Sequence, residues 1–159
     1  MSLDLVRIDD RLVHGQVVIG WGTYLKTTKI ILCSDPIAHS EIESDMYKGA
    51  EETAPHPLSV EIFTQEQTVN ELNKNQIKEK IILLVETPQE LLQLITSGLS
   101  IAKVNIGGMY YKAGKRALAP YIYVDDDDIL CFRKILQLGI QLEGKDIPIG
   151  KAIDISKLV

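Results

Sequence analysis

The chain alternates short, almost continuously apolar runs with longer stretches whose apolar residues recur every three or four positions. Apolar runs such as residues 29–34 and 80–86 are typical of strands that helices cover on both faces. The spacing in residues 15–25 is that of an amphipathic helix. Because strand and helix alternate along the whole chain, the pattern predicts an α/β fold: a mainly parallel sheet of about six to seven strands between two layers of helices.

Turn and capping residues set the expected boundaries of these elements. Thr64 and Gln67 have the spacing of a capping box, and Asp35 before Pro36 indicates an N-cap followed by proline at the first helical position. We expect strands at residues 3–8, 29–34, 59–63, 80–86, 101–106, 121–124 and 140–144, helices at residues 15–25, 35–49, 64–73, 87–98 and 125–139, and a loop over residues 107–120.

Length and composition narrow the class of protein. The 159 residues show no internal repeat or linker, so residues 1–159 are expected to form a single three-layer domain. No apolar run approaches the roughly 20 residues of a membrane span, and the N-terminus does not resemble a secretion signal. The net charge of −5 argues against a nucleic-acid partner. Cys33 and Cys131 lie in apolar runs and are expected to be buried thiols rather than a disulfide or metal clip. We therefore expect a cytoplasmic protein.

Polar chemistry concentrates in three segments that follow predicted strands: residues 9–15, 34–35 and 107–116. In open α/β sheets ligands bind beyond the carboxyl ends of the strands, so these segments are expected to share one edge of the sheet. His14 stands out because it lies at the predicted start of a helix, where free N–H groups favour anions. The glycine after it removes a side chain where a phosphate would approach the backbone.

The neighbours of His14 suggest phosphoryl chemistry. Arg7 and Arg11 supply planar guanidinium groups that match phosphate oxygens, and a neutral imidazole is a nucleophile near pH 7. Asp9 or Asp10 would fix the imidazole tautomer by accepting its other N–H. The alternative is a surface histidine in a turn shaped by an Asp9–Arg11 ion pair. The residues alone leave both interpretations open.

A family resemblance favours the first interpretation. Residues 6–21, "VRIDDRLVHGQVVIGW", resemble the active-site segment of IIB subunits of the mannose/fructose/sorbose family of the phosphoenolpyruvate-dependent sugar phosphotransferase system, and residues 104–129 resemble that family's N-x-G-G-M segment. The residues that match the first motif are Arg7, Asp9, Asp10, Arg11, His14, Gly15, Gln16 and Trp21. The resemblance implies a parallel sheet with flanking helices, in agreement with the alternation described above.

The resemblance also implies an activity, that of a protein-N(pi)-phosphohistidine–sugar phosphotransferase. His14 would accept a phosphoryl group on Nδ1 from a phosphohistidine of a IIA protein. It would then pass the group to a sugar bound by the membrane subunits IIC and IID, with which the chain would associate peripherally at the membrane. The identity of the sugar and the formation of a homodimer are left open by the sequence.

Within this interpretation we assign roles to the segment around His14. Arg11 is the first candidate to bind the equatorial phosphate oxygens, and Asp10 is assigned to the catalytic set with it. The phosphate edge is expected to comprise Arg7, Gly15, Gln16, Gly107 and Gly108. Arg7 has a structural alternative, in which it holds the loop through Asp9 or Asp10. No metal or cofactor is expected, because arginine and backbone dipoles supply the positive charge.

The segment "NIGGMYYKAGKR" does not fit a P-loop. Five residues separate Gly108 from Gly114, where the motif requires four, and Arg116 replaces the Ser or Thr that would bind Mg²⁺. We expect instead a flexible loop over the site whose Lys112, Lys115 and Arg116 form a positive patch for an acidic rim on IIA. A solvated basic loop without that role is the alternative.

The sequence offers other candidate residues and other possible functions. Asp125 to Asp128 are interpreted as the acidic first turn of a helix rather than a metal site. His39 and His56 are expected to be surface residues. One alternative is a non-catalytic anion- or nucleotide-binding module, in which His14 would not be phosphorylated. Another is a histidine-dependent hydrolase, but the sequence has no nucleophile motif such as G-x-S-x-G.

Overall fold

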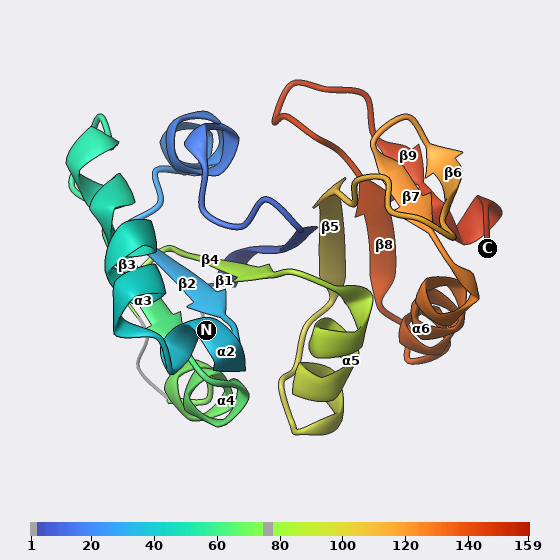
Figure 1. Cartoon of the computed structure of the whole chain (residues 1–159), viewed down its shortest axis with the longest axis horizontal. Helices are drawn as coiled ribbons and strands as arrows, with labels where there is room; N and C mark the ends of the chain where they lie inside the picture. The colour runs from blue at the N-terminus through green and yellow to red at the C-terminus, as the bar shows by residue number, and fades with distance from the viewer. Residues whose placement is uncertain (1–2, 75–77) are drawn as a thin grey trace.

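The computed structural model describes residues 3–74 and 78–159. A seven-stranded sheet in the order β3-β2-β4-β1-β5-β8-β9 runs through the centre of the molecule (Figure 1). All neighbouring strands are parallel except β8 and β9. The predicted α/β class with a mainly parallel sheet is confirmed. The strands are β1 (Leu3–Asp9), β2 (Lys29–Cys33), β3 (Ser59–Phe63), β4 (Ile81–Val85), β5 (Lys103–Gly108), β8 (Gln141–Gly144) and β9 (Ile153–Asp154).

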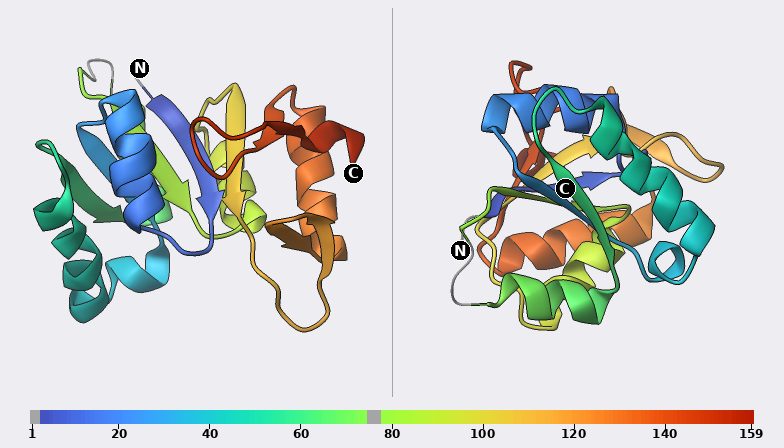
Figure 2. Two further views of the ribbon diagram at one scale, coloured as in Figure 1. Left: turned by 90° about the horizontal axis from the view of Figure 1, so that it is seen from above. Right: turned by 90° about the vertical axis from the view of Figure 1, so that its left-hand side faces the viewer.

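Helices cover both faces of this sheet (Figures 1 and 2). Because successive residues of a strand point to opposite faces, β2 and β4 feed two separate cores. Ile31 and Leu83 pack with the helices of one face, and Ile30 and Ile82 pack with those of the other. The first face carries α4 (Gln65–Leu72), α5 (Pro88–Thr96) and α6 (Asp126–Gln137); the second carries η1 (Gln16–Trp21, a π-helix), α1 (Gly22–Leu25), α2 (Asp35–Ala38), α3 (Glu41–Lys48) and η2 (Gly49–Thr53).

Capping explains where the helices begin. The Thr64–Gln67 capping box is present at α4 as predicted. The single helix predicted over residues 35–49 is wrong, because it is split into α2 and α3. Ser34, not Asp35, caps α2 by accepting the N–H of Ile37, and Ser40 caps α3 by accepting the N–H of Glu43. A second capping side chain within the segment thus starts a new helix.

The predicted loop over residues 107–120 is also partly wrong. Gly107 and Gly108 complete β5, and β6 (Arg116–Ala119) pairs antiparallel with β7 (Ile122–Val124) in a small separate ribbon. The strand β9 was not predicted. Its two residues are too few to produce a period-two pattern, and β6 is largely exposed and carries no apolar alternation that would mark it.

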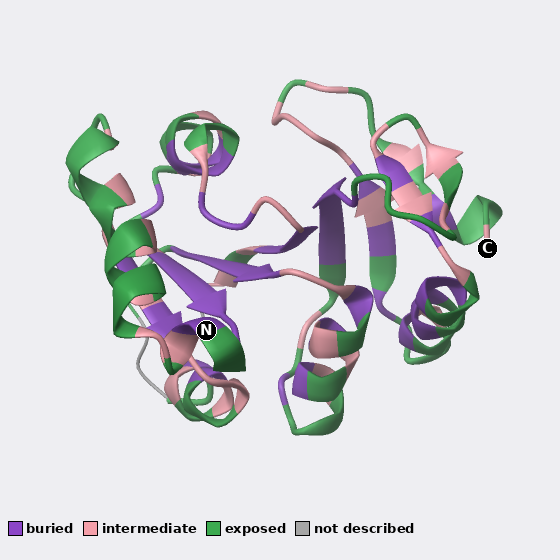
Figure 3. Ribbon diagram, viewed as in Figure 1, coloured by how far each residue is buried: buried purple, intermediate pink, exposed green. Residues whose placement is uncertain are grey.

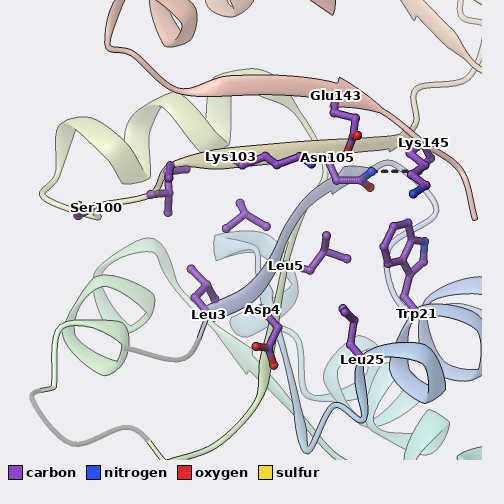
Figure 4. Close-up of a pocket in the computed structure, with 13 residues that line it drawn as sticks. Leu3, Asp4, Leu5, Trp21, Leu25, Ser100, Lys103, Asn105, Glu143 and Lys145 are labelled. Atoms are coloured by element: carbon purple, nitrogen blue, oxygen red, sulfur yellow. Dashed lines mark hydrogen bonds and ion pairs between the residues drawn. The ribbon is translucent and has the colours of Figure 1, made fainter. Parts of the chain in front are cut away.

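The burial pattern follows these layers (Figure 3). The central strands are buried, whereas the outward faces of the helices and the loop over residues 110–114 are exposed. A pocket of about 410 Å³ opens on the sheet face beside η1 and α1, lined by Leu5, Trp21, Lys103 and Asn105 among others (Figure 4). Within the described ranges, no helix is long and apolar enough to cross a membrane.

Candidate functional site

The residues after β1 form a tight loop at the carboxyl edge of the sheet. The loop after β5 leaves the same edge, so residues 10–15 and 109–115 project in one direction (Figure 2). The N–H of Asp10 donates to the carbonyl of Gly108 (3.1 Å), which joins the two loops at their base. Leu12 adopts a left-handed conformation (φ 63°), which is costly for a residue other than glycine. Its side chain is buried and anchors the turn.

Asp9, the last residue of β1, is the centre of the site. Its Oδ2 accepts hydrogen bonds from His14 Nε2 (3.0 Å), Arg11 Nη2 (2.9 Å) and Arg7 Nη2 (3.0 Å). Its Oδ1 accepts from the Nε (3.0 Å) and the backbone N–H (3.1 Å) of Arg11. Burial alone would raise the pKa of the Asp9 carboxyl, but the hydrogen bonds from His14 and Arg11 and the charge of Arg7 bring it well below its usual range. Asp9 is therefore a fully buried carboxylate anion.

This carboxylate fixes the tautomer of His14. An ionised carboxylate only accepts hydrogen bonds, so its contact with Nε2 places the imidazole proton on Nε2. The lone pair of the neutral ring is then on Nδ1, which accepts the backbone N–H of Gln16 (3.3 Å) at the start of η1. The side chain of His14 is 19% exposed. His14 thus presents a nucleophilic nitrogen at a helix start.

The assignment of Asp10 to the catalytic set is not supported by the geometry. Its Oδ2 accepts the N–H of Tyr110 (2.7 Å) in the neighbouring loop, and Asp9 alone of the two aspartates contacts His14. The reason is the two-residue period of a strand: Arg7 and Asp9 share one face of β1, whereas Asp10 lies beyond the strand end. Asp10 joins two loops.

Arg7 is a structural residue. Its side chain has no exposed surface, and all five of its N–H groups point at protein acceptors. Nε and Nη2 donate to Asp9, Nη1 donates to Asn105 Oδ1 (2.6 Å), and the remaining hydrogens reach the carbonyls of Lys145 (3.0 Å) and Asp146 (3.0 Å). The guanidinium also lies over the ring of Trp21. Because every N–H of Arg7 is already bound, no donor is left for a phosphate, and the contacts favour the structural alternative, in which Arg7 holds the loop through Asp9.

The two glycines at the end of β5 make room for this network. A Cβ on Gly107 would lie 1.9 Å from Cζ of Arg7, and one on Gly108 would lie 3.3 Å from Oδ1 of Asp9. The Arg7 guanidinium occupies the space of a side chain at Gly107, and Tyr110 and Asp9 crowd the Cβ position of Gly108, so the structure gives both glycines a packing role. That they line the phosphate stays a prediction.

Arg11 differs from Arg7 in having a free edge. Nε and Nη2 donate to Asp9, but within the described residues Nη1 has no hydrogen-bond partner, and the side chain is 27% exposed. Burial alone would lower the pKa of the guanidinium, but the hydrogen bonds and charge of Asp9 raise it. The group lies over the ring of Tyr110, 5.2 Å from its centroid. Arg11 is a permanent cation with donors left for a ligand.

The predicted positive patch is largely neutralised. Lys115 Nζ binds Asp128 (2.8 Å) and Arg116 Nη1 binds Asp126 (3.1 Å), both in the first turn of α6. Lys112 is exposed and is the cation of this group that has no ion pair with the residues that the structure describes. Asp125 and Asp128 form a capping box. This accounts for the acidic run without a metal ion, and no group of three or more candidate metal ligands occurs in the part of the chain that is described.

The remaining candidates lie outside the site. Asp35 accepts the N–H of Gln65, so the second polar segment serves helix capping. His39 is exposed as expected, whereas His56 is half-buried, with Nε2 against the carbonyl of Thr27 (2.7 Å). Both cysteines are buried free thiols, as predicted, and burial raises the pKa of Cys33 to about 12.

The sequence did not lead us to Tyr110 or to the carbonyls of Lys145 and Asp146, which contact the site from distant segments. Asn105 accepts a hydrogen bond from Arg7 and donates to the carbonyl of Lys145, the second of which is drawn in Figure 4. A buried asparagine within an apolar strand was a usable signal for a structural partner. The backbone carbonyls carry no such signal.

Comparison with known proteins shows similarity over nearly the whole chain. The family model described as PTS system sorbose subfamily IIB component matches residues 3–159. The N-acetylgalactosamine-specific phosphotransferase enzyme IIB component 1 of Escherichia coli (strain K12) is 33% identical over 91% of the chain and 90% of that protein. The crystal structure of the IIBSor domain of the sorbose permease from Klebsiella pneumoniae has a TM-score of 0.89 at 31% identity, covering 99% of the chain and 95% of that domain. The mannose-specific EIIAB component of E. coli (strain K12) is 29% identical over the full chain, which spans 49% of that protein.

Proposed function

The chain belongs to the sorbose subfamily of IIB components of the sugar phosphotransferase system, and we propose that His14 is the residue that carries its phosphoryl group. As a IIB component it is a sugar phosphotransferase that accepts the group from a IIA protein and passes it to a sugar. The single observation that supports His14 is its contact with Asp9, which holds the proton on Nε2 and leaves the Nδ1 lone pair at the start of η1, where it accepts the N–H of Gln16.

The transfer then needs no proton movement. Nδ1 of His14 attacks phosphorus in line, the new N–P bond forms, and the N–P bond to the imidazole of IIA breaks with its electron pair returning to that ring. The phosphorylated His14 ring keeps its proton on Nε2 and becomes cationic. Asp9 is in contact with that proton, so its negative charge stabilises the ring as the charge develops.

Arg11 supplies the positive charge for the phosphoryl oxygens. Its Nη1 edge is free, and the backbone N–H groups of Gly15 and Gln16 begin the adjacent helix. Nη1 of Arg11 is in place before the phosphoryl group arrives, and the N–H of Gln16 moves from Nδ1 to a phosphoryl oxygen when the N–P bond forms, so little reorganisation is required. Gly15 and Gln16 therefore stay in the proposed phosphate site, while Arg7 and the glycines of β5 support it from beneath.

The proposed partners follow from the family. IIA would dock at the carboxyl edge, where Tyr110, Tyr111 and Lys112 are exposed around the His14 loop. The match to half of a mannose-specific EIIAB component is consistent with IIA acting directly on this domain. We further propose that residues 1–159 form one IIB domain around the seven-stranded sheet, and that it works at the cytoplasmic face of membrane subunits IIC and IID.

The test is phosphoryl transfer to purified protein from phosphoenolpyruvate, the general phosphotransferase proteins and a cognate IIA. Wild type should take one phosphoryl group, stable in base and labile in acid, and His14→Ala should take none. His39→Ala is the matched control because it removes an exposed histidine at another site. A labelled His14→Ala variant would overturn the assignment. No transfer to wild type would favour a non-catalytic anion-binding module, and release of inorganic phosphate without a stable label would favour a hydrolase.

A further inference from the structure

Tyr110 contacts the proposed site from the loop that follows β5. Its ring lies under the guanidinium of Arg11, with 5.2 Å between Cζ and the ring centroid. The negative face of an aromatic ring attracts a cation placed over it. Tyr110 is 43% exposed, so burial in the core does not explain its position.

A second contact ties Tyr110 to the same loop as Arg11. The backbone N–H of Tyr110 donates to Oδ2 of Asp10 (2.7 Å), and the N–H of Asp10 donates to the carbonyl of Gly108 (3.1 Å). The ring also lies close over Gly108, where an added Cβ would come within 3.0 Å of it. The tyrosine is therefore held by its backbone and placed by its packing.

Arg11 needs such support because Asp9 accepts hydrogen bonds from only one edge of its guanidinium group. The two hydrogen bonds from Nε and Nη2 fix that edge in the plane of the carboxylate. They leave the guanidinium free to tilt about the line of contact, and any tilt moves the unbound Nη1. The Tyr110 ring, which attracts the guanidinium that lies over it, opposes that tilt.

We propose that Tyr110 is a positioning residue for phosphoryl transfer, holding the plane of Arg11 so that Nη1 points at the phosphoryl group on His14. The inference rests on the proposed function. Tyr110 acts through Arg11 and makes no contact with the reacting atoms, and its hydroxyl has no part in the role. Phenylalanine should therefore replace it, whereas alanine should not.

The chain offers a matched control in the next residue. Tyr111 is 66% exposed on the same loop, and its ring meets the edge of Tyr123 instead of Arg11 (5.7 Å between centroids). Both tyrosines lie where IIA would dock. Tyr111→Ala therefore reports the loss of an aromatic contact with IIA, without the loss of support to Arg11.

The experiment is rapid-quench transfer from phospho-IIA over a range of IIA concentrations, which separates the maximal rate from the half-saturating concentration. Tyr110→Ala should lower the maximal rate about tenfold, because small displacements of a positioned group are costly to rate. The half-saturating concentration should change less than about twofold. Tyr110→Phe should keep the wild-type maximal rate, and Tyr111→Ala should raise the half-saturating concentration more than it lowers the maximal rate.

A double variant shows whether the effect runs through Arg11. In an Arg11→Ala background, Tyr110→Ala should have no further effect on the maximal rate. Persistence of the tenfold loss in that background, an equal loss in Tyr110→Phe, or a change confined to the half-saturating concentration would overturn the proposal. Failure of the proposed function is a distinct result, because wild type itself would then take no label. Thermal unfolding of each variant checks that the fold is retained.

Discussion

Arg7 and Arg11 bind the same carboxylate yet belong to two different halves of the site. The half around Arg7 is fully buried, and every N–H of the guanidinium has a protein acceptor in Asp9, Asn105 or a backbone carbonyl. The Arg11 half is open, with Nη1 free and an exposed tyrosine beneath. Residue type and spacing therefore do not distinguish a structural arginine from a ligand-binding one. The two are distinguished by the number of N–H donors that the protein leaves unbound.

The largest effect on stability should come from a substitution of Arg7, in the buried half of the site. Arg7→Ala leaves the buried Asp9 carboxylate short of a partner and empties a packed site, so the free energy of unfolding should fall by about 3–5 kcal/mol. Arg133→Ala, which removes an exposed arginine from α6, should change it by less than about 0.5 kcal/mol. Urea denaturation measures both. Equal losses in the two variants would contradict the structural role of Arg7.

A substitution of Arg11, in the open half, should affect the rate of transfer more than the stability of the fold. Arg11→Ala should lower the maximal rate of phosphoryl transfer about 100- to 1,000-fold, as loss of one charge-stabilising donor does in other enzymes. It should lower the free energy of unfolding by only about 1 kcal/mol, because the pair is part-exposed. Arg116→Ala, at an exposed ion pair with Asp126, is the control and should keep the rate within about twofold. A stability loss as large as that of Arg7→Ala would erase the distinction.

The space around Arg7 allows a sharper test of packing. Gly107→Ala puts a methyl group where the Arg7 guanidinium lies, and should lower the free energy of unfolding by about 1–3 kcal/mol or more. Gly49→Ala has open space around the added methyl and a negative φ, so stability should be unchanged or slightly higher. Chemical denaturation of both variants decides between them. An unaffected Gly107→Ala would show that Arg7 is not confined as described.

The smallest expected effect is the pH dependence of stability that comes from Asp9, the carboxylate that both arginines bind. Because the pKa of Asp9 is lowered in the folded state, its stabilising contribution is complete above the unfolded pKa of about 4 and is lost as the pH falls below it. Wild type should therefore lose stability more steeply than Asp9→Asn between pH 5 and pH 2. Denaturation curves across that range measure the two slopes, and parallel slopes would contradict the account.

The sequence was a good guide to the sheet because its signals are local. Continuous apolar runs marked β2 and β4, a capping box marked α4, and an acidic first turn marked α6. The split of α2 from α3 was missed because Ser40 competes with a helix that the segment otherwise favours. β9 was missed because pairing with β8, rather than its own pattern, makes it a strand.

The site was predictable in its centre and less so at its rim. His14 and Arg11 were marked by their spacing, and an aspartate partner for His14 was expected, although the choice between Asp9 and Asp10 needed the end of β1 to be known. The structural role of Arg7 depends on its hydrogen bonds to the carbonyls of Lys145 and Asp146, which lie some 140 residues away along the chain. No local pattern encodes such contacts.

The proposed transfer depends on Asp9 holding the proton on Nε2 of His14 and leaving Nδ1 to carry the phosphoryl group. Long-range ¹H–¹⁵N correlation spectra of ¹⁵N-labelled protein, recorded before and after transfer from phospho-IIA, test it directly. We predict an Nε2-protonated His14 in the free protein and a phosphorus coupling to Nδ1 afterwards. Phosphorylation at Nε2, or at a residue other than His14, would contradict the account.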